Sequence, residues 1–138
     1  MSLDVISGAG SIISNVLDYT KWIKAMIDSS GPISAAGHKA VTSARTLTNE
    51  DTEPFTGVES YALGWVKGVY RGEEFVTHSG GMEAFVTLVY FFPRLKYGLV
   101  TFANNAHTSG PAEQTLLFHL IDEKLGIQES ERFNFTKQ

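Results

Sequence analysis

The stretch FVTHSGGMEAFVTLVYFFP, from Phe75 to Pro93, decides the fold of this sequence. Two segments rich in aromatic and β-branched residues, 73–77 and 84–92, predict two strands. Between them stands the polar tetrapeptide His78-Ser79-Gly80-Gly81. We therefore expect a junction between strands here, where the tetrapeptide either faces a ligand or forms a Gly-Gly bulge with His and Ser capping the strand ends.

Further strands flank this stretch on both sides. A preceding strand is expected over 61–70, followed by a turn at Arg71-Gly72, and a further strand over 97–103, reached through the short turn 93–96. The segments 84–92 and 97–103 do not alternate cleanly between apolar and polar residues. Such strands are normally covered on both faces, so the sequence predicts helices on each side of an antiparallel sheet.

Three helices are expected around this sheet. The first begins after an N-cap at Ser14 and ends before Gly31-Pro32, and a weaker pattern covers 34–45. The last begins at Pro111 and ends at Gly126. Residues 46–60 are rich in turn-forming residues and predict an irregular surface connection.

The predicted fold class is α+β. An antiparallel sheet of three to four strands is flanked by two N-terminal helices and one C-terminal helix, and residues 1–138 form a single unit. Three helices are few for a sheet covered on both faces, so we expect part of the covering to be missing.

Composition limits the possible partners. The chain has 138 residues and a net charge of -4, with no run of either sign, which argues against nucleic acid or an anionic membrane. It has no Cys, and none of its four His lies three or four residues from another, so we expect no metal site and no cofactor. The compartment is left open.

The tetrapeptide is the strongest candidate for chemistry. A backbone N–H of a glycine at this position can stabilise an oxyanion, and His78 and Ser79 can donate to a substrate or relay a proton. Ser79 is not expected to be a nucleophile with His78 as its base, because neighbouring residues of a strand point to opposite faces. Trp65, beside Gly64, is expected near the same site and, with Gly80 and Met82, to contact substrate.

Three motifs in this order resemble a known family. GAGSIISNVLDYTKWIKAM (8–26), YALGW (61–65) and HSGGMEAFVTLVYFFPRLKYGLVTFANN (78–105) are similar to the C-terminal half of the serine β-lactamase and penicillin-binding-protein superfamily. The closest branch is the class C β-lactamase-like one, which includes esterases and peptidases. The resemblance implies an amide or ester substrate and an acyl-enzyme route.

The resemblance also implies roles for single residues. His78 takes the place of the Lys in the family's K-T-G element, Ser79 that of the Thr and Gly80 that of the Gly. The N–H of Gly81 would complete the oxyanion hole. These assignments come from the family's motif and not from spacing alone.

Two motifs of that family are absent from this chain. No Ser is followed three positions later by Lys, as in S-x-x-K, and no Tyr is followed two positions later by Asn, as in Y-x-N. We therefore expect a C-terminal segment of a larger enzyme, inactive alone, whose partner is the missing N-terminal segment or a second copy of the chain. The alternative is a stand-alone, non-catalytic module that binds a ligand or self-associates.

Overall fold

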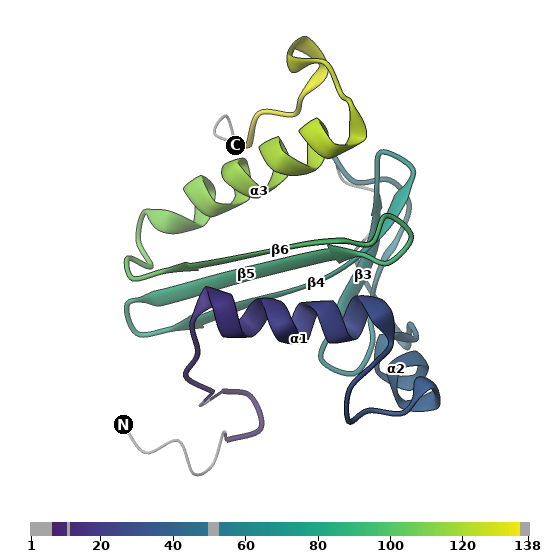
Figure 1. The fold of residues 1–138 in the computed structure, drawn as a ribbon. Coiled ribbons are helices and arrows are strands. Elements are labelled where there is room, and N and C mark those ends of the chain that lie inside the picture. The colour runs from purple at the N-terminus through teal and green to yellow at the C-terminus, as the bar shows by residue number, and fades with distance from the viewer. Residues whose placement is uncertain (1–6, 11, 50–52, 136–138) are drawn as a thin grey trace.

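The computed structural model describes residues 7–10, 12–49 and 53–135, which fold as three α-helices and one six-stranded antiparallel sheet (Figure 1). In chain order the elements are α1 (Val16–Asp28), α2 (Ala35–Thr42), β1 (Thr46–Asn49), β2 (Glu59–Tyr61), β3 (Val66–Tyr70), β4 (Glu73–Met82), β5 (Phe85–Phe92), β6 (Tyr97–Ala103), α3 (Ser109–Leu125) and a short 3-10 helix (Glu129–Glu131). The spatial order of the strands is β1-β2-β3-β4-β5-β6. Within the described ranges, no helix is long and apolar enough to cross a bilayer.

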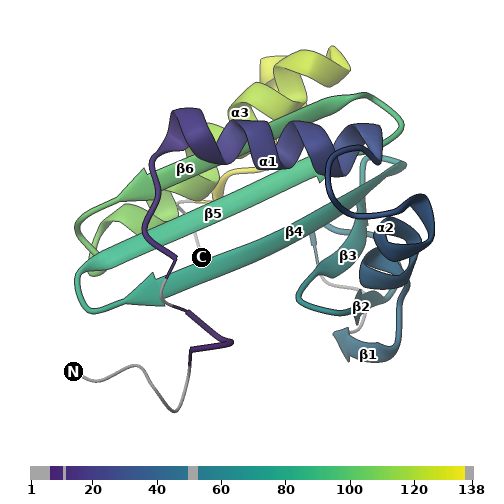
Figure 2. The same cartoon turned by 60° about the horizontal axis from the view of Figure 1, so that its bottom comes forward.

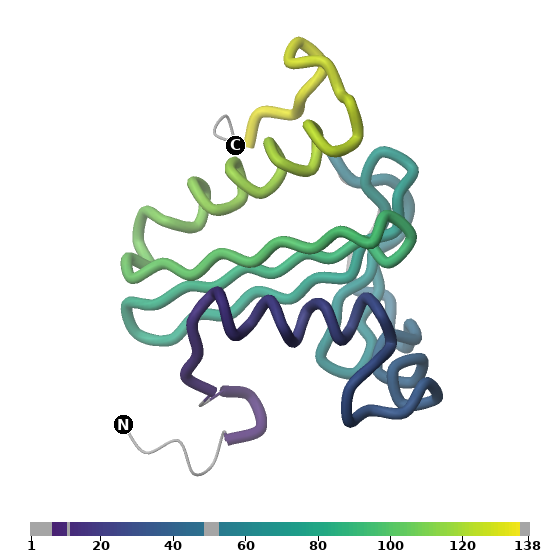
Figure 3. The backbone as a smooth tube through the Cα atoms, in the orientation of Figure 1, coloured from purple at the N-terminus to yellow at the C-terminus, as the bar shows by residue number. Residues whose placement is uncertain are grey.

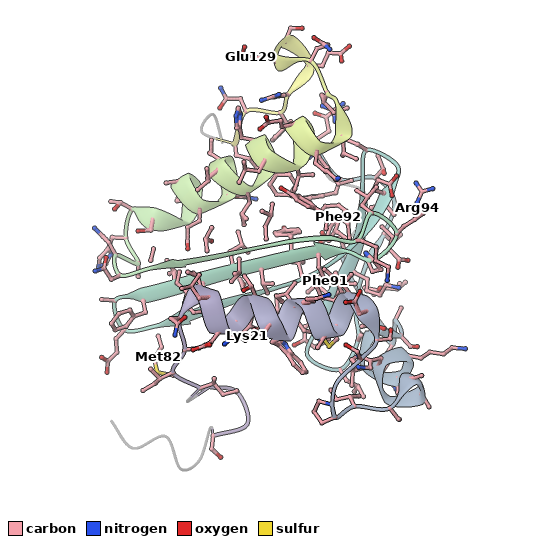
Figure 4. The ribbon with its side chains drawn as sticks, viewed as in Figure 1. Lys21, Met82, Phe91, Phe92, Arg94 and Glu129 are labelled. Atoms are coloured by element: carbon pink, nitrogen blue, oxygen red, sulfur yellow. The ribbon has the colours of Figure 1, made fainter. Side chains whose placement is uncertain are left out.

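The helices cover the sheet from two sides, as expected. Helices α1 and α2 lie on one side and α3 lies on the other (Figure 1). Figure 4 shows Phe91 directed toward α1 and its neighbour Phe92 directed toward α3. Two separate buried clusters result, because successive side chains of a strand point to opposite faces.

The predicted α+β class is confirmed, although the sheet has six strands and not three to four. The two further strands, β1 and β2, come from the segment expected to be irregular. Neither has a long apolar pattern, and their pairing is made by backbone groups, which a search for periodicity does not detect. The single strand expected over 61–70 is divided by a turn at Gly64, whose φ is +78°.

The helix ends differ slightly from those expected. Asn15, and not Ser14, caps α1, because its side chain accepts a hydrogen bond from the N–H of Asp18 at 3.0 Å. Helix α3 begins at Ser109, two residues before Pro111. Gly126 ends it in the left-handed conformation with φ of +72°, as predicted.

The tetrapeptide His78-Ser79-Gly80-Gly81 does not lie at a junction between strands. It belongs to β4, and the register with β5 runs without interruption from Val76↔Phe91 to Met82↔Phe85. Of the two alternatives for the tetrapeptide, the Gly-Gly bulge is therefore wrong. The chain turns later, at 83–84, where Glu83 adopts a φ of +54°.

Candidate active site

Strand β4 changes its neighbours at Thr77. From Glu73 to Thr77 it pairs with β3 on one edge, where Val66 lies opposite Thr77, and from Val76 onward it pairs with β5 on the other edge. From His78 to Met82 it pairs only with β5 among the strands of the described ranges. In this part of the strand, every second residue therefore directs its backbone N–H and C=O toward an edge that β3 does not cover.

The same residues are exposed to solvent. Thr77 is 7% exposed, whereas the side chains of Met82 and Phe85 are 38% and 61% exposed. Figure 2 shows this end of β4 and β5 extending beyond α1, and the tube in Figure 3 follows the chain through the turn at the tip of the hairpin. The tetrapeptide thus lies on a rigid strand that projects from the core.

His78 has hydrogen bonds at both ring nitrogens. Its Nδ1 lies 2.6 Å from the carbonyl oxygen of Ser79, and its Nε2 lies 2.9 Å from the hydroxyl oxygen of Tyr61. Tyr61 is the last residue of β2 and was not identified from the sequence as a site residue. The two residues are 17 positions apart, and only the arrangement of the strands brings them together.

Ser79 lies on the other face of the sheet from His78. His78 pairs with Val89, a member of the cluster under α1, whereas Ser79 pairs with Leu88, which packs against the cluster under α3. This agrees with the expectation that His78 is not the base for the Ser79 hydroxyl. The two side chains can act on a ligand only from opposite sides of the strand.

The two glycines of the tetrapeptide have different surroundings. A Cβ atom at Gly80 would lie 2.6 Å from Oγ1 of Thr87 on β5, so packing across the hairpin requires glycine there. A Cβ atom at Gly81 would meet nothing closer than the carbonyl oxygen of Phe85 at 4.0 Å. Among the described residues, open space therefore lies above the face of the strand at Gly81.

Of the two apolar residues expected to contact substrate, only one lies at this end of the sheet. Met82 is at the tip of β4, where its Cε lies 2.9 Å from the position of a Cβ at Gly10 (Figure 4). Trp65 is 6% exposed and its ring meets Phe91 edge-on, with centroids 5.2 Å apart. A substrate contact for Trp65 stays a prediction, but its burial favours a packing role.

The acidic side chains and histidines of the described residues do not gather into a group that could hold a metal ion. The chemistry available at the end of β4 is therefore that of one imidazole, one phenol, one hydroxyl and the backbone N–H groups of an uncovered strand edge. Such a set can orient a substrate and stabilise an oxyanion. The hydroxyl that meets the imidazole is that of Tyr61, and the hydroxyl of Ser79 lies on the opposite face of the strand from His78.

The sequence is similar to known hydrolases over most of its length. Residues 1–121 match the family described as Beta-lactamase. The chain is 42% identical to the unguisins hydrolase ungD of Aspergillus violaceofuscus and 41% identical to the unguisins hydrolase ungD' of Aspergillus campestris. Each match covers 96% of this chain but only 26% and 25% of the respective relative, so the chain spans about a quarter of their length.

A solved structure has the same fold. The octameric penicillin-binding protein homologue from Pyrococcus abyssi superposes with a TM-score of 0.70 at 21% sequence identity. The match covers 87% of this chain and 26% of the homologue. At this identity the likeness concerns the fold alone, and the α+β arrangement around an antiparallel sheet is therefore shared.

Proposed function

The chain belongs to the β-lactamase family, and we propose that residues 78–82 form one wall of the active site of a serine hydrolase that cleaves an amide or ester through an acyl-enzyme. The observation that carries this proposal is the exposed half of β4, residues 78–82, whose edge β3 does not cover and which holds both His78 and Gly81.

Each residue of the wall has a proposed role. The N–H of Gly81 donates to the oxyanion of the tetrahedral intermediate. A single donor of this kind lowers the activation free energy by about 3 kcal/mol. His78 and Ser79 anchor the substrate or the leaving group from opposite faces of the strand. Gly80 permits the close packing of the hairpin, and Met82 contacts the apolar part of the substrate.

The nucleophile is proposed to lie outside these 138 residues. No Ser in the chain has a Lys three positions later, and the related hydrolases are about four times as long. Without a nucleophile, an oxyanion donor stabilises an intermediate that cannot form. We therefore expect the chain alone to be inactive.

Exposed apolar side chains support a covering polypeptide near this wall. Ile12 and Ile13 are 89% and 98% exposed, Leu17 on α1 is 76% exposed, and Phe85 is 61% exposed. Such side chains often mark a surface that another polypeptide covers. We propose that the segment carrying S-x-x-K covers them. If the chain is instead a self-associating module, a second copy of the chain would cover them.

A chimera tests this function directly. In the unguisins hydrolase of A. violaceofuscus, the matching segment is replaced by this chain, and hydrolysis of unguisins is followed by mass spectrometry. The chimera is expected to be active, while the separate chain hydrolyses neither unguisins nor an activated ester. His78→Ala should lower kcat/KM of the chimera at least about tenfold, as expected for a group that orients the substrate or relays its proton.

Two glycine variants examine the oxyanion donor. Gly81→Pro removes the N–H and should lower kcat by about 100-fold or more, whereas the control Gly81→Ala keeps the N–H and should retain most of the activity. Circular dichroism verifies that both variants fold. The proposal is wrong if the separate chain hydrolyses the ester, or if folded His78→Ala and Gly81→Pro chimeras keep full activity. A stable dimer of an inactive chain, with an inactive chimera, would favour the self-associating module.

A further inference from the structure

His78 is exposed, yet neither of its ring nitrogens is free. The Nδ1 atom faces the carbonyl oxygen of Ser79 at 2.6 Å, and the Nε2 atom faces the hydroxyl of Tyr61 at 2.9 Å. A solvated histidine on an exposed strand needs no partner from the protein, because water satisfies both nitrogens. Two contacts within hydrogen-bond distance therefore call for an explanation.

The partners determine where the proton of a neutral His78 resides. A carbonyl oxygen only accepts hydrogen bonds, so Nδ1 must carry the hydrogen and donate to Ser79. Nε2 of the neutral ring then carries a lone pair and accepts, and the O–H of Tyr61 donates to it. The hydrogen bond made at one ring nitrogen thus selects the tautomer at the other.

The fold holds Tyr61 in place for this contact. The hydrogen bond from the N–H of Ala62 to the carbonyl oxygen of Trp65, at 2.7 Å, closes the turn after β2. Strand β3 begins only at Val66, so Tyr61 at the end of β2 reaches past β3 to His78 on β4. The two rings meet edge-on, with centroids 5.9 Å apart and planes at 66°.

We propose that Tyr61 is a positioning residue of the active site, which selects the Nδ1–H tautomer of a neutral His78 ring and fixes that ring against β2. This inference rests on the proposed function, in which His78 belongs to the substrate wall and acts on the substrate through the hydroxyl of Tyr61. While the pair is intact, His78 has no free N–H, and a ligand meets the lone pairs of the Tyr61 oxygen. The pair therefore favours a substrate group that donates a hydrogen bond, such as an amide N–H, over a carboxylate.

The tautomer can be measured without any catalysis. In the 15N-labelled chain at about pH 8, where an ordinary imidazole is neutral, two-bond 15N–1H correlation spectra distinguish a protonated from an unprotonated ring nitrogen. The signals of His78 are assigned by their loss in His78→Ala. We expect protonated Nδ1 and unprotonated Nε2 in the wild-type chain. In Tyr61→Phe the ring loses its second anchor and can rotate away from the Ser79 carbonyl oxygen, so we expect a mixture of tautomers there.

A matched variant controls for loss of a phenol elsewhere. Tyr19→Phe removes a hydroxyl from α1, where the ring packs against Phe102, and should leave the His78 spectrum unchanged. Wild-type His78 protonated at Nε2 would overturn the inference even if no variant could be purified. An unchanged spectrum in Tyr61→Phe would overturn it equally.

The chimera separates this inference from the proposed function. Tyr61→Phe should lower kcat about tenfold with a smaller change in KM, since the ring of His78 stays but loses its fixed orientation. If the Tyr61→Phe chimera is fully active while the His78→Ala chimera is impaired, only the role of Tyr61 is refuted and the proposed function stands. Full activity of His78→Ala would refute the proposed function, whatever tautomer the spectra show.

Discussion

The two halves of β4 share one strand and one partner but differ in what covers them. Phe75, Val76 and Thr77 are buried, whereas residues 78–82 are exposed, although the register with β5 runs without interruption from Val76 to Met82. Backbone pairing therefore does not decide exposure. The difference arises from the neighbours beyond the pair. Strand β3 begins at Val66, opposite Thr77, and side chains of α3 and α1 belong to the same buried clusters as Phe75 and Val76.

The difference also explains how one strand serves both stability and binding. The buried half fixes the position of the strand through close packing on both faces, and packing of this density allows little movement. The exposed half then presents its backbone and side chains from a rigid support. A site on such an element is held more precisely than one on a loop.

The largest expected effect is on folding stability, and it comes from truncating an aromatic side chain in the buried half of β4. Phe75→Ala removes a fully buried side chain that packs with Phe55 and Tyr90, and should lower the free energy of unfolding by about 3–5 kcal/mol. The control Phe85→Ala, in the exposed half of the hairpin, should change it by only about 0.5 kcal/mol. Urea unfolding followed by circular dichroism measures both, and equal losses would contradict the comparison.

The second largest effect is a loss of folding stability at alkaline pH, caused by two buried tyrosines. Burial raises the pKa of both Tyr70 and Tyr90 to about 12, and for Tyr70 a hydrogen bond to the Asp122 carboxylate adds to the shift. An unfolded tyrosine ionises near pH 10. The stability that each neutral, buried tyrosine gives the folded state is therefore complete below about pH 10 and is lost as the pH rises toward 12. The loss should reach about 2–3 kcal/mol for each tyrosine.

Unfolding in urea at a series of pH values from 8 to about 11.5 tests this expectation. In Tyr70→Phe the alkaline loss should be smaller, because only Tyr90 of the pair remains to ionise. A free energy of unfolding that stays constant across this range would show that the two phenols are not held in a low-dielectric interior.

The smallest effect sharpens the comparison within the exposed half. Gly80→Ala places a Cβ 2.6 Å from Oγ1 of Thr87 and should cost about 1 kcal/mol of folding stability. Gly81→Ala meets only open space and should change the stability by no more than about 0.5 kcal/mol. Thermal unfolding of the two variants measures the difference, and a larger cost at Gly81 would mean that its surroundings are not open.

Much of the fold was predictable because its longer elements have strong local signals. Helical spacing identified α1 and α3, Gly126 marked the end of α3, and the Pro93–Lys96 turn joined β5 to β6. Strands β1 and β2 were missed because short polar strands at a sheet edge are defined by their backbone partners. The N-cap of α1 was misplaced by one residue because both Ser14 and Asn15 are good capping residues.

The site was predictable in part. The tetrapeptide of β4 was identified because a polar Gly-Gly pair is unusual between apolar strand segments, but it was expected at a bend and not within the strand. Tyr61 was missed because no local pattern connects it to His78. Its contact depends on where β2 ends, where β3 begins and how far β4 extends.

The sequence by itself determined the α+β class, the main helices and strands, the family resemblance and the chemical groups of the candidate site. These follow from short-range periodicity and from residue types, which act over a few neighbouring positions. Only the tertiary structure decided that the tetrapeptide continues β4, that its end is exposed and that Tyr61 meets His78. Those features depend on the relative lengths of strands and helices that are distant in the chain, and on which of them covers the other.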